Sequence, residues 1–276
     1  MIEERLRVYL QYLERGTVRR RHDTYAHTNP DRPSSGRFVI PGVTPHDDPG
    51  LTFEEAKGRY DVAWVPARQS TASRRISQKG RGSVRGSLVD HARWIVLTFE
   101  SMLEYYLANI LMADPNCKRI EDQPPAVKYF LGKPMEHYFD FRSTSTSNYR
   151  IAYNVKPAEF LERDRTLQKI DAIKSVHIPR FANQALIVTE NEITREKGLN
   201  AVDINDARKE RNQADCDQVH ERLLSVGKPI QIWKLQDMIG DLSMVWNALL
   251  CLFFDRKVHI QRPGVRFSDE RMVVAA

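Results

Sequence analysis

The sequence of 276 residues lacks the signatures of several large protein classes. Its three cysteines stand far apart and form no CxxC pair, which argues against a zinc ribbon and against a dithiol redox motif. Its eight histidines include no HExxH motif, and its charged beginning does not resemble a signal peptide. The longest apolar stretch, residues 244–254, is interrupted by Asn247 and is too short to span a bilayer. We therefore expect a soluble protein of the reducing cytoplasm with no membrane partner.

Acidic residues are the smaller charged group. The chain has 42 Lys and Arg against 36 Asp and Glu, which gives a net charge of +6 and an isoelectric point near 9.2. This balance suits a partner rich in phosphate, although a merely basic soluble protein has the same balance. With 41% hydrophobic residues the chain can bury a core, and its length fits one large or two moderate domains.

Residues 1–90 are expected to form an N-terminal helix and a basic, loop-rich arm. Helical spacing of apolar residues between positions 2 and 13 predicts the helix, and residues 23–50 are rich in Pro, Asp, Ser and Gly, as in an extended loop. Residues 74–85 carry five positive charges and no acid, with glycines that let the backbone approach a phosphate chain. We predict that this segment contacts DNA, a solvated loop being the alternative. Its charges are Arg74, Arg75, Lys79, Arg81 and Arg85.

Residues 91–196 are expected to form an α/β core in which helices flank a mixed sheet. The predicted elements are a buried helix at 94–112, strands at 127–130, 136–141 and 148–155, a helix opened by Pro157, and a strand at 185–189. Residues 142–147, rich in Ser and Thr, are the predicted turn between two of these strands. In the helix after Pro157 we expect Leu167 to lie on the buried side with Ile170 and Ile173.

Residues 197–276 are expected to form a C-terminal helical domain like a winged helix. A polar helix at 203–224 and two further apolar helices precede alternating stretches at 257–261 and 265–267, which predict a two-stranded hairpin. Trp246 and Phe254 are expected in the core. Basic residues near the hairpin are candidates for phosphate contacts, although a protein-docking wing is the alternative. These residues are Arg256, Lys257, Arg262 and Arg266.

Acids and a lysine follow one another in an order that suits phosphodiester hydrolysis. A metal ion can polarise the phosphoryl oxygen, Mg²⁺ prefers carboxylate oxygens, and a lysine can stabilise the developing charge. Asp140 follows an apolar strand, and Asn154 and Lys156 are two residues apart on the next strand, so they point to the same face. We predict that Asp140 is a metal ligand and that Lys156 is catalytic.

A helix acid completes this set. Glu100 and Glu104 are four residues apart and share one face of an apolar helix. A buried carboxylate is costly unless it is paired or binds a metal, so one of them is a candidate ligand. Glu104 is preferred, with Glu100 as the alternative. An acid that faces solvent or pairs with an arginine would also explain the pattern.

Five fragments in order resemble one family, the TnsA endonucleases, which belong to the PD-(D/E)XK restriction-like nucleases. The fragments are Phe99-Glu100-Ser101-x-Leu103-Glu104, Gln123-Pro124, Phe139-Asp140-Phe141, Val155-Lys156-Pro157 and Val188-Thr189-Glu190-x-Glu192-Ile193. The resemblance covers roughly residues 94–193 and continues more loosely toward the C-terminus. It implies a restriction-endonuclease-like core, in which Gln123-Pro124 shapes the entry to a strand.

The resemblance also implies an activity. TnsA proteins use Mg²⁺, for which Mn²⁺ can substitute, to cut the 5′ ends of a cut-and-paste transposon in double-stranded DNA. Their partners are a DDE transposase and an AAA+ ATPase regulator, so a nucleoid-associated location follows. Carried over by position, Glu104 and Asp140 would bind the metal, with the Val155 carbonyl as a further ligand.

Asn154 departs from the family pattern, which has Gln or Glu two residues before the lysine. An amide oxygen can still bind a hard cation, but Asn is one methylene shorter than Gln. Two other functions therefore stay open. The chain could be a DNA-binding assembly factor with a degenerate nuclease fold, or a stand-alone restriction or defence nuclease.

Overall fold

The computed structural model describes residues 36–39, 63–74, 84–262 and 264–276, which fall in two compact units, 1–68 and 69–276. In the first unit, β1 (Gly36–Val39) and β2 (Ala63–Pro66) pair as antiparallel strands. The helix predicted near residues 2–13 and the basic residues Arg75, Lys79 and Arg81 lie outside the described residues.

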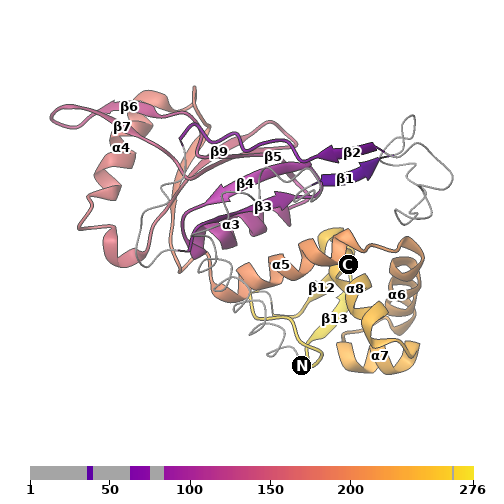
Figure 1. Ribbon diagram of the computed structural model, residues 1–276. Helices are drawn as coiled ribbons and strands as arrows, with labels where there is room; N and C mark the ends of the chain where they lie inside the picture. Colours follow the sequence, from indigo (N-terminus) through magenta and orange to yellow (C-terminus); the bar gives the residue numbers. More distant parts are fainter. Residues whose placement is uncertain (1–35, 40–62, 75–83, 263) are drawn as a thin grey trace. The chain divides into compact units, whose positions relative to one another are not determined.

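The second unit is built on a mixed four-stranded sheet (Figure 1). Its order is β10 (Gln184–Val188), β9 (Arg150–Val155), β8 (Phe141–Ser145) and β5 (Cys117–Asp122). β10 runs parallel to β9, and the other neighbours are antiparallel. The mixed sheet that the sequence predicted is therefore confirmed.

Helices cover both faces of this sheet. α3 (Met102–Met112) packs its Leu107 and Leu111 into a cluster that includes Tyr153, whereas α4 (Thr166–His177) packs into a cluster that includes Ala152. Successive residues of a strand point to opposite faces, so neighbours on β9 meet different helices. Helices flank the sheet, as predicted.

The helix predicted over residues 94–112 is wrong in its first part. β3 (Gly86–Asp90) and β4 (Ile95–Phe99) form an antiparallel hairpin, and burial alternates along β4. α3 begins only after Ser101, whose hydroxyl accepts a hydrogen bond from the Glu104 N–H. An apolar run with β-branched residues supports a strand as well as a helix, and the cap decides where the helix starts.

The strand predicted at 136–141 is divided in two. β6 (Val127–Phe130) and β7 (Pro134–His137) form a separate hairpin, and β8 starts at Phe141. The turn predicted at 142–147 is also displaced, because β8 continues to Ser145 before the chain turns into β9. The strands at 127–130, 150–155 and 184–188 agree with the prediction.

The segment after Pro157 differs from the predicted helix. A 3₁₀ turn, η1 (Ala158–Phe160), comes first, and α4 starts at Thr166. Ile170 and Ile173 are buried as expected, but Leu167 is 61% exposed, so its predicted burial is wrong. Leu167 lies in the first turn of α4, roughly 120° around the helix axis from Ile173, so it falls outside the face that packs on the sheet.

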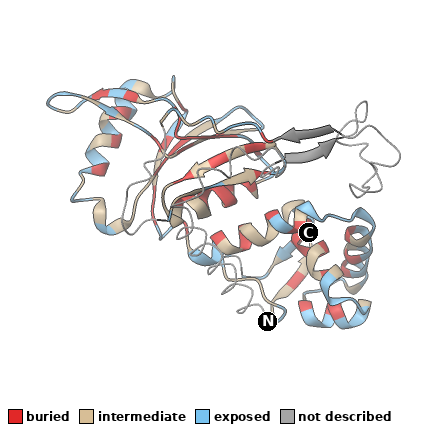
Figure 2. Ribbon diagram, in the orientation of Figure 1, coloured by how far each residue is buried: buried red, intermediate tan, exposed pale blue. Residues whose placement is uncertain are grey.

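The C-terminal part has its own core. Its elements are α5 (Arg195–Lys209), α6 (Gln213–Val226), β11 (Ile230–Gln231), α7 (Ile232–Ile239), α8 (Leu242–Phe254), β12 (Val258–Ile260) and β13 (Met272–Ala275). α8 supplies more buried residues to this core than any other element (Figure 2), and Trp246 packs against it. None of the helices that the structure describes is long and apolar enough to cross a membrane.

The predicted C-terminal hairpin is partly wrong. β12 is present, but residues 265–267 form no strand, and β12 pairs with β13 instead. β13 also pairs with β11, which gives a three-stranded sheet. The connection between β12 and β13 is therefore longer than the short turn of the predicted hairpin.

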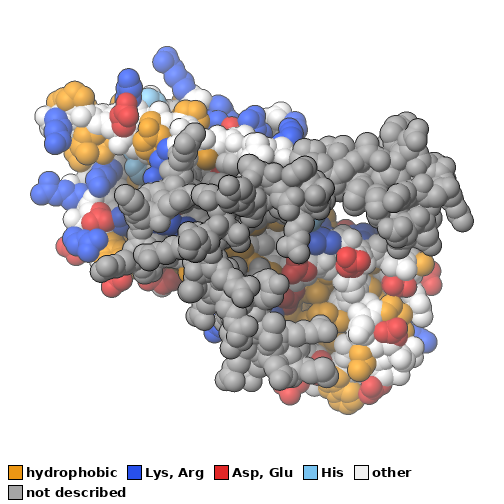
Figure 3. Space-filling view, in the orientation of Figure 1, with side chains coloured by type: hydrophobic (Ala, Val, Ile, Leu, Met, Phe, Trp, Pro, Cys, Tyr) orange, Lys and Arg blue, Asp and Glu red, His pale blue; other side chains and the backbone are white. Residues whose placement is uncertain are grey.

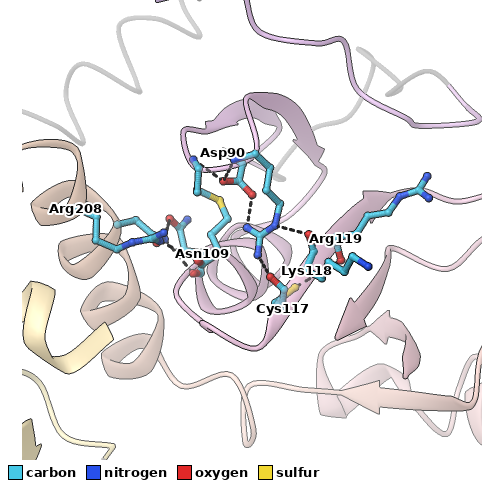
Figure 4. A network of polar contacts seen from close by, with 10 residues as sticks. Asp90, Asn109, Cys117, Lys118, Arg119 and Arg208 are labelled. Carbon is cyan, nitrogen blue, oxygen red and sulfur yellow. Dashed lines mark hydrogen bonds and ion pairs between the residues drawn. The ribbon is translucent and has the colours of Figure 1, made fainter. Parts of the chain in front are cut away.

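α5 connects the C-terminal part to α3. The Asn205 amide donates to the Asn109 carbonyl at 3.0 Å, and Arg208 Nη1 donates to the Met112 carbonyl at 3.0 Å (Figure 4). The two helices approach closely at Gly198, since a Cβ at this position would lie 2.3 Å from the Tyr106 ring. Only glycine leaves room for this approach. α5 therefore packs on the helix that carries Glu104.

The loop between β3 and β4 is tied to the same region. The Arg93 guanidinium pairs with buried Asp90 and donates to the carbonyls of Cys117 and Lys118 (Figure 4). These bonds fix the β3–β4 hairpin to the start of β5.

All three cysteines, Cys117, Cys216 and Cys251, are buried and free.

Candidate active site

Glu104 lies at the first turn of α3 and forms a variant of the capping box, in which its carboxylate reaches the N–H of Glu100 rather than that of the N-cap residue Ser101. Its carboxylate accepts the Glu100 N–H at 2.7 Å and the Ser101 hydroxyl at 3.0 Å, while its own N–H donates to that hydroxyl at 3.1 Å. A capping box satisfies backbone donors that the helix leaves unpaired. This capping role explains why a buried acid occurs at position 104, and it fixes the orientation of the carboxylate.

Asp140 lies between β7 and β8, where three backbone contacts hold it. Its N–H donates to the Tyr153 carbonyl at 2.9 Å, and its carbonyl accepts from the Gln123 N–H at 2.8 Å. Its carboxylate accepts from the Val155 N–H at 2.6 Å. The Asp140 carboxylate thus takes the place of a neighbouring strand as acceptor for the Val155 N–H at the end of β9. Val155 stands between the candidate residues Asn154 and Lys156.

The electrostatics of Glu104 and Asp140 are linked. Burial raises the pKa of Asp140, the negative charge of Glu104 raises it further, and the Val155 N–H and Arg74 oppose the shift. Burial also raises the pKa of Glu104, against its hydrogen bonds from Glu100 and Ser101. Two carboxylates that repel each other away from water favour a bound proton or a bound cation between them.

Glu104, Asp140 and the nearby backbone offer oxygen atoms, which are the ligands that a hard metal ion prefers. Mg²⁺ is held by one or two carboxylates and keeps several waters, so Glu104, Asp140 and a backbone carbonyl such as that of Val155 form an appropriate donor set. Within the described ranges, no group of three or more His, Cys, Asp or Glu side chains could hold a metal. Any metal here would therefore depend on two acids, a carbonyl and water.

Glu100 has a partner of its own. Its carboxylate forms an ion pair with Arg74 at 2.7 Å, and the Arg74 guanidinium also lies 5.8 Å from the centre of the Tyr138 ring. Arg74 lowers the pKa of Asp140 as well, so it contributes positive charge to the acidic group. Arg85 is half-buried, and the rest of the predicted DNA-contacting segment lies outside the described residues.

The ammonium group of Lys156 lies with a different acid. It forms an ion pair with Asp164, which holds the pKa of that carboxyl at about 2, and its backbone N–H donates to the Val188 carbonyl at 3.0 Å. In the described part of the chain, no ion pair joins Lys156 to Asp140 or Glu104. The structure therefore places Lys156 next to Asp140 in the sheet but turns its charge toward the segment before α4.

Asn154 is buried and contacts His137. Burial lowers the pKa of His137 to about 4, the charges of Lys169 and Lys156 lower it further, and a hydrogen bond with the Asn154 amide opposes the shift. His137 Nε2 has no hydrogen-bond partner among the described residues. Asn154 thus belongs to a second polar group on the α4 side, separate from the Glu104–Asp140 pair.

Gln123 is a site residue whose environment the sequence did not predict. The side chain is 1% exposed, and neither of its amide atoms has a hydrogen-bond partner within the described ranges, although its backbone N–H bonds to Asp140. A buried amide without a hydrogen-bond partner lowers the stability of a protein by about 1–3 kcal/mol. The Gln-Pro fragment was a signal for this position, but it indicated only a structural role.

Asp122, the residue before Gln123, is buried for a structural reason. Its carboxylate accepts the Thr98 N–H at 2.8 Å and also the hydroxyls of Thr98, Ser70 and Thr71. These bonds attach the segment around residue 70 to β4 and β5. A carboxylate with this many donors needs no metal.

The basic residues of the C-terminal part are divided between ion pairs and solvent. Arg256 pairs with Asp114 at 3.3 Å, and Arg266 pairs with Asp203 at 2.6 Å. Lys257 and Arg262 are exposed. Lys257 and Arg262 are therefore accessible to a phosphate, whereas Arg256 and Arg266 form ion pairs within the protein.

No protein-family model matches this chain, and no curated protein matches it. The structure defines a broad class, a mixed α/β protein with a mixed sheet flanked by helices.

Proposed function

We propose that this chain is a metal-dependent DNA endonuclease that cuts transposon 5′ ends within a cut-and-paste transposase complex, as its resemblance to TnsA implies. The supporting observation is the pair of carboxyls from Glu104 and Asp140, whose pKa values burial raises. Perturbed acids of this kind are typical of functional sites. The Val155 N–H orients Asp140, and the capping box orients Glu104.

Mg²⁺ would be held by Glu104, Asp140 and the Val155 carbonyl, and Mn²⁺ could replace it. The ion would supply charge stabilisation for the scissile phosphate and a more acidic bound water. Lys156 would stabilise the developing charge after its ammonium group leaves Asp164. Asn154 would support the polar group to which Lys156 belongs, through its contact with His137.

The proposed partners are double-stranded transposon ends, a DDE transposase and an AAA+ ATPase. From α6 onward, the order of helix, short strand, two helices and two strands supports a winged-helix-like domain. Residues 197–276 carry twelve Lys or Arg against eleven Asp or Glu, so this part is nearly neutral. That balance fits protein docking at least as well as DNA binding.

The decisive measurement is nicking of element-end DNA in the presence of transposase and Mg²⁺. We expect Asp140→Ala and Lys156→Ala each to reduce the nicking rate by about 100-fold or more, since each removes a group aimed at transition-state charge. Glu221→Ala, which removes an exposed acid of α6, is the matched control and should cut normally. Unchanged nicking by the Asp140 and Lys156 variants would falsify the proposal.

A second function, a DNA-binding assembly factor without cleavage, has its own support. Lys156 is paired with Asp164, and Asn154 stands where the family has Gln or Glu. This function predicts salt-sensitive DNA binding and no cutting with either Mg²⁺ or Mn²⁺. Cutting by the purified chain on DNA without element ends would instead favour a stand-alone nuclease.

A further inference from the structure

The β6–β7 hairpin presents a mixed apolar and basic face to solvent. It forms its own two-stranded sheet, and burial alternates along β6, with Val127 and Tyr129 inside. Lys128 and Phe130 therefore share the outer face, opposite Glu136 and Pro134 of β7. The inner face packs in the cluster that also contains Ile170 and Ile173 of α4.

Phe130 is the unusual residue of this face. It is 66% exposed, although the alternating pattern of a half-buried strand places polar residues outside. It adjoins the hairpin tip, where Leu131, Gly132 and Lys133 connect the strands and Gly132 has a φ of 72°. A Cβ on Gly132 would meet no atom within 4 Å, so the tip is open to solvent. A large ring at an open tip is available to an external partner.

Basic residues lie on this hairpin and on the end of α4 that contacts it. The Lys128 side chain is 84% exposed, and its ion pair with Glu136 spans 3.9 Å, so it is too loose to occupy the lysine. His177, at the end of α4, bonds to the Lys128 carbonyl, and Lys174 lies in the same last turn of that helix. Lys174 also has only a loose pair, with Asp171 at 3.9 Å.

The charge balance of this region is more basic than that of the C-terminal part. Residues 127–137 and 165–180 carry six Lys or Arg against two Asp or Glu, whereas residues 197–276 are nearly balanced. Acids do occur nearby, at Glu159, Glu162 and Asp164, but they precede the N-terminus of α4, and the hairpin contacts its C-terminal end. Figure 3 shows Lys and Arg side chains next to hydrophobic ones over the hairpin and α4.

We propose that the β6–β7 hairpin is a DNA-contacting element, in which Lys128 and Lys133 contact phosphates and Phe130 inserts as an apolar wedge between bases. Apolar side chains flanked by basic ones act in this way when proteins unstack and bend DNA. Basic side chains supply the affinity, because each phosphate contact releases a counterion. The partner class rests on the proposed function, but DNA binding does not require cleavage.

Charge complementarity decides for DNA over a protein partner. A protein-docking face is depleted in lysine at its centre, and here lysines flank the ring on both sides in sequence. A second copy of the chain would bring the same lysines into contact with one another, which is unfavourable unless acids intervene. Duplex DNA offers both phosphates for Lys128 and Lys133 and base faces for Phe130.

The test measures binding of the full chain to short duplex DNA by fluorescence anisotropy, with EDTA present so that nothing is cut. A plot of log affinity against log salt has a negative slope. For the Lys128→Ala and Lys133→Ala double variant, we expect the magnitude of this slope to decrease by about 2, because about one counterion is released per phosphate contact. For Phe130→Ala we expect about 5-fold weaker binding with an unchanged slope. End-to-end energy transfer across the duplex should report bending by the wild type that Phe130→Ala loses.

Matched controls come from the C-terminal part, where Leu224 is an apolar residue with 55% exposure, against 66% for Phe130, and Lys228 is an exposed lysine. Leu224→Ala and Lys228→Ala should bind and bend DNA like the wild type. The proposal is overturned if the hairpin variants do so too, if they change self-association instead, or if the wild type binds no DNA. A wild type that binds through the hairpin but never cuts would overturn the nuclease function and leave this inference standing.

Discussion

At the scale of single residues, the candidate site consists of two groups that meet at the end of β9. Glu104 and Asp140 share a buried electrostatic environment, and Asn154 and Lys156 contact His137 and Asp164 instead. Val155 separates the groups, since its N–H binds Asp140 while its neighbours in sequence belong to the second group. An active nuclease would need both groups to act on one phosphate, which requires Lys156 to exchange its partner.

His137 should make stability depend on pH. Its folded-state pKa of about 4 lies below the ordinary value of 6.5, so the unfolded chain binds a proton more readily between these values. Stability from the neutral ring is fully present above pH 6.5 and is lost as pH falls toward 4, by about 3 kcal/mol for a shift of this size. The causes are burial, the charge of Lys169 on α4 and the charge of Lys156 just after β9, with the hydrogen bond of Asn154 opposing them.

We expect His137→Gln to flatten this part of the pH profile, measured by urea unfolding between pH 4 and pH 7. His259→Gln, at an exposed position on β12, is the control and should keep the wild-type profile. Equal slopes for the wild type and His137→Gln would contradict the assignment.

At the scale of elements, the contact between α3 and α5 depends on a glycine. A Cβ on Gly198 would lie 2.3 Å from Tyr106, too close for any real contact. We expect Gly198→Ala to destabilise the protein by about 1–3 kcal/mol through overpacking, despite the better helix propensity of alanine. Urea unfolding measures the loss.

The paired change Tyr106→Ala tests the cause. Tyr106→Ala removes the ring atoms at 2.3 Å but keeps the Tyr106 Cβ, 2.6 Å from the added Cβ, so the cost of Gly198→Ala should fall in this background without disappearing. The same cost in both backgrounds would show that the ring is not what excludes a side chain at position 198.

Elements were predicted best where one periodicity prevailed. The strands at 150–155 and 184–188 are apolar runs with clear ends, and both agree with the prediction. The error at β4 arose because its apolar residues continue directly into α3, and periodicity alone does not separate two adjacent apolar elements. β13 was missed because its partners, β11 and β12, are set by the tertiary structure.

At the scale of the whole molecule, residues 69–276 share one structural framework. α5 packs on α3 through Asn109 and Asn205, and it also contributes Ala207 to the C-terminal core. Unfolding of the C-terminal part would therefore remove the support of the helix that carries Glu104. We expect a single cooperative transition for this unit, with hydrogen exchange in α3 and α8 reporting the same free energy of opening.

Asn205→Ala tests this coupling. It removes the amide that donates to the buried Asn109 side-chain oxygen at 3.2 Å, which costs about 1–3 kcal/mol, and both helices should lose protection together. Loss of protection in α8 alone, with α3 unaffected, would mean that the two parts unfold independently.

The sequence by itself determined the mixed α/β composition, several strands and the positions of Glu104, Asp140 and Lys156 along the chain, because these depend on local periodicity and spacing. Only the tertiary structure decided which charges meet. Asp164 lies eight residues beyond Lys156 and Arg74 lies far before Glu100, and no local pattern links either pair. Burial decided the rest, since the unpaired amide of Gln123 and the depressed pKa of His137 arise from neighbours that folding brings together.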